Sequence, residues 1–95
     1  MPPLPTVRHN SAEHRFEATT DHGLATLRYI ERGKVLDLAH TAVPQEAEGQ
    51  GLGSALAHAA LQHARHDGLK VIPSCPFVHA YLQKHKEYAD LVARP

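Results

Sequence analysis

The chain has 95 residues, of which 42% are hydrophobic and 21% are charged, the composition of a globular protein rather than of a disordered chain. This length corresponds to a single domain, 1–95, with one hydrophobic core. Ten Lys and Arg side chains balance ten Asp and Glu side chains, so the chain has no basic excess to neutralise a nucleic-acid backbone, and we expect no nucleic-acid partner.

The N-terminus reads Met-Pro-Pro-Leu-Pro and contains neither a charged segment nor a long apolar run. We therefore expect no signal peptide, no transmembrane helix and no membrane partner. Residues 1–6 are rich in proline and are expected to be disordered. The single cysteine cannot form an internal disulfide, which fits a reducing compartment, and we expect a cytoplasmic location.

The first half of the chain alternates in the manner of β-strands. Strands are predicted at residues 7–10, 14–19, 24–30 and 35–43, separated by turns that contain Gly23 and Gly33. Because these turns are too short for crossover connections, the strands form an antiparallel meander. In the third strand, alternation assigns Leu24, Thr26, Arg28 and Ile30 to one face and Ala25, Leu27 and Tyr29 to the other.

A helix is predicted over residues 52–66, rich in alanine and leucine and followed by Gly68. Its apolar stripe is expected to consist of Leu52, Leu56, Ala59, Ala60 and His63, with Ala55 and Ala64 beside it. A short strand at 69–73 then follows, and the intervening helix allows it to lie parallel to the strand at 35–43. Pro76 opens a further helix that runs to about residue 84, and residues 87–93 form a last turn or helix.

These elements predict an α/β domain of the layered α+β type. Its mixed, mostly antiparallel sheet has about five strands, with helices packed on it.

Residues 49–54 read Gly-Gln-Gly-Leu-Gly-Ser and connect a strand to a helix. Glycines at the start of a helix leave several backbone N–H groups open, and these donors together with the helix dipole favour a phosphate group. Gly49, Gly51 and Gly53 supply bare backbone, and Ser54 adds a hydroxyl. The segment is not a P-loop, because no Lys follows the glycines, and its spacing differs from the dinucleotide fingerprint.

This loop, preceded by Val43 and Pro44, resembles the acetyl-coenzyme A loop of the GNAT superfamily of N-acetyltransferases. The later segment Ile-Pro-Ser-Cys-Pro-Phe-Val at 72–78, followed by Tyr81 and by His-Lys-Glu-Tyr at 85–88, resembles the very short, single-domain branch of that superfamily. The resemblance covers about residues 40–91. It implies a minimal GNAT fold, acetyl-coenzyme A as co-substrate, and transfer of the acetyl group to a small-molecule or protein amine.

By this resemblance, Val43 holds the pantetheine arm and places the thioester carbonyl near a backbone N–H. The residues expected to contact the cofactor are Val43, Gly49, Gln50, Gly51, Leu52, Gly53, Ser54, Cys75 and Pro76. One position departs from the pattern, because Glu48 stands where the superfamily usually has Gln or Arg. A carboxylate near a diphosphate is unfavourable unless it points away.

Cys75 precedes Pro76 and is therefore expected at the cap of a helix, where the dipole lowers the pKa of a thiol. Three interpretations remain open for it. The thiol accepts the acetyl group and passes it on, it contacts the pantetheine arm, or it is a small buried hydrophobic residue.

Tyr81 resembles the tyrosine that protonates the departing coenzyme A thiolate in many members of the superfamily. The alternative interpretation is that the Tyr81 ring only packs under the loop. His40 precedes Val43 by three residues and could deprotonate an acceptor amine or Cys75. The alternative interpretation of His40 is a structural one, in which its side chain is hydrogen-bonded on a half-buried strand. Thr41 beside it could order a water molecule.

The nine histidines are expected to be surface residues, because no metal-binding motif or cysteine pair accompanies them. We therefore expect no metal. His63 is attributed to packing near the helix end.

Two further functions are weighed against acetyl transfer: a non-catalytic module that binds coenzyme A or acetyl-coenzyme A, and an acyl-cysteine protein that uses Cys75. By the same resemblance, we expect the N-terminal helices that build the acceptor wall in the superfamily to be missing here. The cleft is therefore expected to accept a macromolecule or to be completed in a homodimer.

Overall fold

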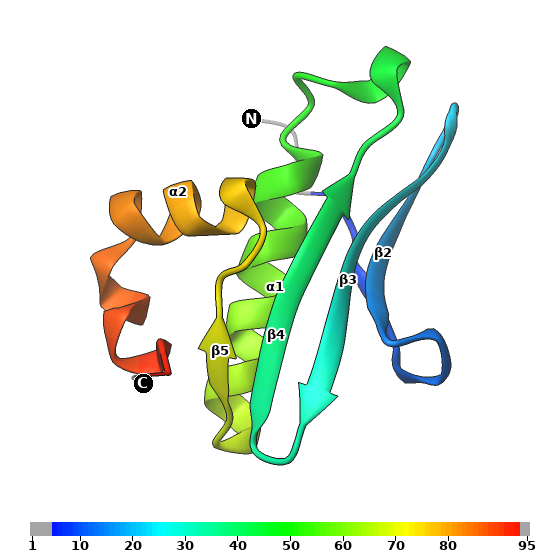
Figure 1. Cartoon of the computed structure of the whole chain (residues 1–95). Helices are drawn as coiled ribbons and strands as arrows, with labels where there is room; N and C mark the ends of the chain where they lie inside the picture. Colours follow the sequence, from blue (N-terminus) through cyan, green and yellow to red (C-terminus); the bar gives the residue numbers. More distant parts are fainter. Residues whose placement is uncertain (1–4, 94–95) are drawn as a thin grey trace.

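The computed structural model describes residues 5–93 as one sheet with helices on one face (Figure 1). The elements are β1 (Arg8–Asn10), the 3-10 helix η1 (Ser11–Glu13), β2 (Arg15–Thr20), β3 (Gly23–Arg32), β4 (Val35–Ala42), the 3-10 helix η2 (Gln45–Ala47), α1 (Leu52–Asp67), β5 (Lys70–Ile72), α2 (Pro76–Lys84) and the 3-10 helix η3 (Lys86–Leu91). Of residues 1–6, which are expected to be disordered, residues 1–4 lie outside the described range. None of the helices within 5–93 is long and apolar enough to cross a bilayer.

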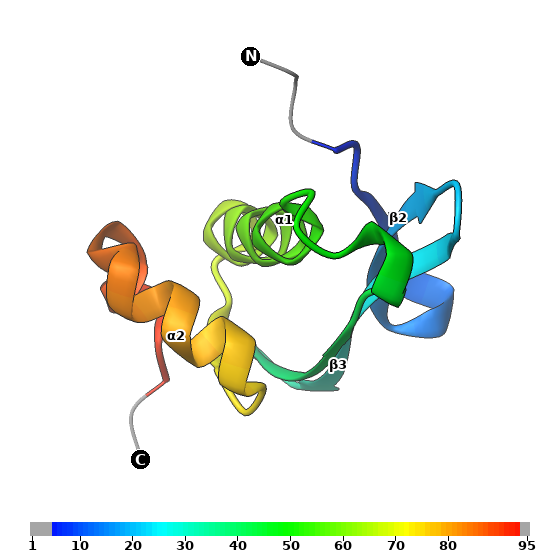
Figure 2. The same ribbon diagram turned by 90° about the horizontal axis from the view of Figure 1, so that it is seen from above.

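The sheet has five strands in the order β1-β2-β3-β4-β5. The first four strands pair antiparallel, and β5 pairs parallel with β4. The helix α1 makes the crossover between β4 and β5, as a parallel pair requires. Seen from above, the sheet curves around α1, and α2 lies beside α1 toward β5 (Figure 2). The predicted fold class, with its mixed and mostly antiparallel sheet, is therefore confirmed.

A β-bulge interrupts the pairing of β3 with β4. The register shifts between Arg28 and Tyr29, so that Ala39 is an extra residue in β4. The neighbouring cross-strand pairs are Leu27 with Thr41, Arg28 with His40, and Tyr29 with Leu38. Directly opposed residues share a face, so the bulge turns Thr41 toward α1 and His40 toward the opposite, exposed face.

The helix α1 is buried over a wider arc than its predicted stripe. Ala57 and Leu61 are fully buried, although the stripe omits both, whereas Ala59 and His63 are only partly buried. At 3.6 residues per turn, the buried positions cover roughly two thirds of the helix circumference. The sheet covers one side of α1, while α2 and η3 cover a second side. The predicted apolar stripe was too narrow because the prediction assumed that α1 packs against the sheet alone.

Side-chain hydrogen bonds attach η3 to α1. Gln62 donates from Nε2 to the hydroxyl of Tyr88 at 2.7 Å, and Arg65 donates to both carboxylate oxygens of Asp90. Arg65 also donates to the backbone carbonyl of Glu87 at 2.8 Å. The C-terminal segment is therefore part of the domain, because it covers the second side of α1 and satisfies polar groups along it.

Glu17 is a carboxylate on β2 that is only 5% exposed, and it accepts hydrogen bonds from Arg8 and Arg15. These two arginines lower its pKa from 4.5 to about 2. A carboxyl whose pKa is lower in the folded state stabilises the fold above the unfolded-state pKa, and this contribution is lost as the pH falls.

We expect the stability difference between the natural protein and Glu17→Gln to be largest above about pH 4.5 and to shrink as the pH falls toward 2. Thermal unfolding of both proteins by circular dichroism, at steps between pH 7 and pH 2, measures this difference. The other carboxylates are common to both proteins and cancel in the comparison. A difference in midpoint that stays constant over the whole range would contradict the assignment.

Candidate functional site

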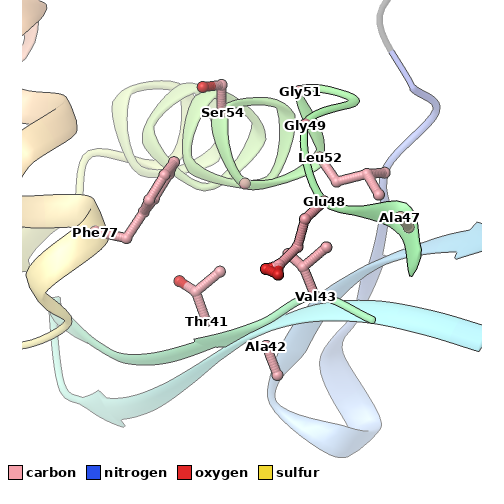
Figure 3. Close-up of a pocket in the computed structure, with 11 residues that line it drawn as sticks. Thr41, Ala42, Val43, Ala47, Glu48, Gly49, Gly51, Leu52, Ser54 and Phe77 are labelled. Atoms are coloured by element: carbon pink, nitrogen blue, oxygen red, sulfur yellow. The ribbon is translucent and has the colours of Figure 1, made fainter. Parts of the chain in front are cut away.

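A cavity of about 610 Å³ opens between the end of β4 and the N-terminus of α1. Figure 3 shows the glycine-rich turn along one side, the last residues of β4 along another, and the ring of Phe77 across from them. The lining residues are Thr41, Ala42, Val43, Ala47, Glu48, Gly49, Gly51, Leu52, Gly53, Ser54 and Phe77. The cavity thus joins the end of the central strand to the start of the long helix.

The turn before α1 presents open backbone donors to this cavity. Gly49 and Gly51 have φ angles of +85° and +79°, in the left-handed region that glycine adopts readily. Gly51 is the N-cap of α1, and no side chain caps this helix end. The N–H groups of Leu52, Gly53 and Ser54 therefore have no partner inside the helix, and they can donate to an anion at the positive end of the helix dipole.

Gly53 leaves room for the ring of Phe77 against the first turn of α1. A Cβ atom at this position would lie 2.8 Å from Cζ of Phe77, a distance that real Cβ atoms do not tolerate. Phe77 is 43% exposed and stands in the cavity wall rather than in the core. The bare backbone at Gly53 therefore allows the aromatic ring to form one wall of the cavity.

Glu48 is the only charged side chain among the described residues that line this cavity. In Figure 3 its carboxylate points into the cavity, toward the space between Val43 and Thr41. This orientation differs from the one that a bound diphosphate would favour. Because Glu48 is exposed, rotation about its side-chain bonds can place the carboxylate in water.

Cys75 is the N-cap of α2, as predicted, and it is 4% exposed. Its Sγ lies 3.2 Å from Oγ1 of Thr41, and its N–H donates to the carbonyl of Leu38 at 2.9 Å. Burial raises the pKa of the thiol, but the Thr41 hydroxyl and the N–H groups of Val78 and Phe77 outweigh burial and lower the pKa overall. Thr41 lines the cavity and Cys75 does not, so the thiol lies one residue behind the cavity wall.

Tyr81 lies in a second, smaller cavity of about 140 Å³. Its ring stacks on that of His85, with the ring centroids 4.0 Å apart. Burial raises the pKa of the Tyr81 phenol, and the charges of Tyr88 and Glu87 raise it further. The two cavities share Ser54 and Phe77 as lining residues, so they are neighbours on either side of the Phe77 ring.

The structure brings only part of the predicted site together. Six residues predicted to contact the cofactor line the larger cavity: Val43, Gly49, Gly51, Leu52, Gly53 and Ser54. Gln50, Cys75 and Pro76 do not line it. Nor do the predicted catalytic residues Tyr81 and His40, and the bulge in β4 places His40 on the far face of the sheet.

The sequence prediction omitted Phe77, Ala42 and Ala47 from the site. It mentioned Glu48 as a departure from the family pattern and Thr41 as a residue that could order water, and it counted neither among the site residues. For Phe77 a signal existed, because a glycine inside a helical pattern often has a packing reason, and Gly53 lies within the first turn of the predicted helix. The inward orientation of Thr41 had no local signal, since it depends on the bulge.

Two histidines outside these cavities, His9 and His63, are partly buried and contact other side chains of the domain. His63 lies with its ring centroid 4.4 Å from that of His9, and its Nε2 is 3.6 Å from Oδ2 of Asp67. His9 contacts the hydroxyl of Tyr29 at 2.6 Å. Within residues 5–93, no group of three or more His, Cys, Asp or Glu side chains is placed to hold a metal ion.

Comparison with known proteins agrees with this architecture. A sequence model described as GCN5-related N-acetyl-transferase matches residues 15–91. Protein NATD1 from Mus musculus and from Homo sapiens is 32% identical over 82 residues in each case, covering 83% of this chain and 74% and 73% of those proteins.

A solved structure gives the same result for the fold. The solution NMR structure of a GCN5-like candidate N-acetyltransferase from Staphylococcus aureus matches with a TM-score of 0.73 and 30% identity, over 97% of this chain and 91% of that chain. The match of the family model over most of the chain, together with these relatives, shows that this protein belongs to the GCN5-related N-acetyltransferase family.

Proposed function

We propose that the protein binds acetyl-coenzyme A in the larger cavity and transfers its acetyl group to an amine. The observation that carries this proposal is the continuity of the cavity, which runs from open backbone donors at the start of α1 to the end of β4. An elongated ligand with an anionic centre and a neutral arm fits such a cavity.

The diphosphate of coenzyme A is assigned to the N-terminus of α1. The N–H groups of Leu52, Gly53 and Ser54 donate to its oxygens, and the helix dipole stabilises the negative charge. The glycines at 49 and 51 leave room for the phosphates, because nothing lies within 4 Å of a Cβ atom built at either position.

The uncharged pantetheine arm is assigned to the end of β4, beside Val43 and Thr41. This part of the cavity offers small and apolar side chains together with one hydroxyl, which matches a neutral amide chain that ends in a thioester. During transfer, the neutral amine nitrogen attacks the thioester carbonyl carbon and loses one proton, the carbon–sulfur bond breaks, and the departing thiolate takes up a proton. Glu48 faces this end of the cavity, and its negative charge attracts a cationic acceptor.

Calorimetry and a thiol assay test the proposal together. Coenzyme A and acetyl-coenzyme A are titrated into the folded protein, and release of free thiol is then followed with a panel of small amines and a lysine-containing peptide. Binding with steady thiol release supports the transferase. Binding without turnover for any amine would favour the non-catalytic module instead. No heat from either ligand at millimolar concentration would overturn the proposal.

The acyl-cysteine function is a second candidate, supported by the lowered pKa of the Cys75 thiol. Its burial and its hydrogen-bond contact with Thr41 favour a different role, in which the thiol orients the Thr41 hydroxyl.

We therefore expect Cys75→Ser to retain most of the thiol release, because a hydroxyl can still contact Thr41. We also expect no acetyl adduct at Cys75 when the natural protein is incubated with acetyl-coenzyme A. Intact-protein mass spectrometry, with the variant as the matched control, measures the adduct. A stoichiometric acetyl increment that disappears in Cys75→Ser, with loss of turnover, would establish the covalent route instead.

A further inference from the structure

The larger cavity contains a carboxylate whose charge no neighbouring cation compensates. Glu48 follows the 3-10 helix η2 directly, and its exposed side chain lines the cavity. None of the ion pairs among the described residues includes its carboxylate. No Lys, Arg or His side chain is among the described residues that line the cavity. The carboxylate is therefore available to a cation that enters from solvent.

This carboxylate faces the end of the cavity that is assigned to the thioester. In Figure 3 it points toward the space between Val43 and Thr41, at the end of β4. The open N–H groups at the start of α1 attract the diphosphate to the other part of the cavity. The carboxylate of Glu48 thus lies beside the uncharged arm of the cofactor, where the acceptor must also arrive.

We propose that Glu48 selects an acceptor amine that carries a second positive charge, such as an alkyl diamine. This inference rests on the proposed function. The reacting nitrogen must be neutral to attack, because a protonated nitrogen has no free electron pair, and its excess proton goes to solvent. A simple amine therefore brings no positive charge to Glu48 at the moment of attack. A diamine keeps its second ammonium group, which pairs with the carboxylate.

Glu48→Gln tests this selection, because it removes the charge and keeps the shape of the side chain. Thiol release is measured at saturating acetyl-coenzyme A with diaminobutane and with aminobutanol, which has a similar length and an uncharged polar end. The ratio of the two kcat/KM values is expected to fall about fivefold in the variant, the upper range for an exposed ion pair. The different basicities of the two amines cancel, since they are the same for both proteins.

Two further properties identify the effect as charge attraction. The change is expected in KM for diaminobutane and not in kcat, because the ion pair is equally present before and during attack. The preference of the natural protein for diaminobutane is also expected to shrink at high ionic strength, because salt screens exposed charges. An unchanged ratio in Glu48→Gln would overturn the inference and leave the proposed function standing.

Glu46→Gln is the matched control for the loss of one negative charge. Glu46 is exposed on η2, two positions before Glu48, and it does not line the cavity. This variant is expected to keep the kcat/KM ratio of the natural protein. An equal fall of the ratio in Glu46→Gln would assign the effect to net charge and overturn the selection by Glu48.

Calorimetry with coenzyme A separates selection of the acceptor from a role in holding the cofactor. Glu48→Gln is expected to bind coenzyme A at least as tightly as the natural protein does, because one charge of the same sign as the diphosphate is removed. Weaker binding of coenzyme A by this variant would show that Glu48 serves the cofactor, and it would overturn the inference.

The outcomes also separate this inference from the proposed function. No thiol release with either diaminobutane or aminobutanol would overturn the inference. The proposed function would fall with it only if the wider panel of amines and the lysine-containing peptide also gave no thiol release.

Discussion

Gly51→Glu is expected to abolish coenzyme A binding, with a loss of at least about 100-fold in affinity, while the protein stays folded. The new carboxylate stands at the N-cap of α1, in front of the three open N–H groups that are assigned to the diphosphate. It repels the phosphates and competes with them for the same donors. No atom lies within 4 Å of a Cβ atom built at Gly51, so the Cβ atom of the new side chain meets no steric clash.

The substitution also has a conformational cost, because Gly51 has a φ of +79°. A left-handed conformation costs a non-glycine residue about 1–2 kcal/mol, which a domain of this size tolerates. Gly33→Glu is the matched control. Gly33 has a φ of +62°, has nothing within 4 Å of an added Cβ atom, and lies in the turn between β3 and β4, away from the larger cavity.

Both variants are expected to lose similar stability in chemical denaturation, and only Gly51→Glu is expected to lose the calorimetric heat of coenzyme A binding. Unchanged affinity in a folded Gly51→Glu protein would refute the assignment of the diphosphate to this loop. Equal loss of binding in Gly33→Glu would show that the effect follows from strain or net charge and not from the position of the carboxylate.

Leu61→Ala is expected to lower the free energy of unfolding by about 2–5 kcal/mol, a large part of the stability of a small domain. Leu61 is fully buried, on the part of α1 that the predicted apolar stripe leaves out. Shortening its side chain removes apolar contacts and leaves a void in a close-packed interior. Urea denaturation followed by circular dichroism measures the change.

Leu24→Ala is the matched control, since Leu24 on β3 is 44% exposed and the same atoms are removed. We expect this change to alter stability by no more than about 0.5 kcal/mol. If Leu61→Ala were as mild as Leu24→Ala, the second packing surface of α1 against α2 and η3 would be in doubt.

The order and type of the elements follow from local patterns in the sequence. Alternation in β3 assigns Ala25, Leu27 and Tyr29 to the buried face, and all three are buried. The turn at Gly33, the cap at Gly68 and the start of α2 at Pro76 also agree with the structure. These features depend on residues close together in the chain, which is why periodicity and turn chemistry predict them.

The site depended on contacts between distant segments. Local alternation along β4 cannot reveal the bulge at Ala39, because the bulge exists only in the pairing with β3, and it decides that Thr41 and not His40 faces α1. The same holds for Phe77, whose ring lies against the bare backbone of Gly53 although the two residues belong to different helices.

The sequence by itself determined the succession of strands and helices and the glycine-rich turn with its open backbone donors, since these are properties of neighbouring residues. Only the tertiary structure decided which side chains surround that turn, where Cys75 and Tyr81 lie relative to it, and how much of α1 is buried. Those outcomes depend on strand register and helix packing, which join residues that are far apart in the chain.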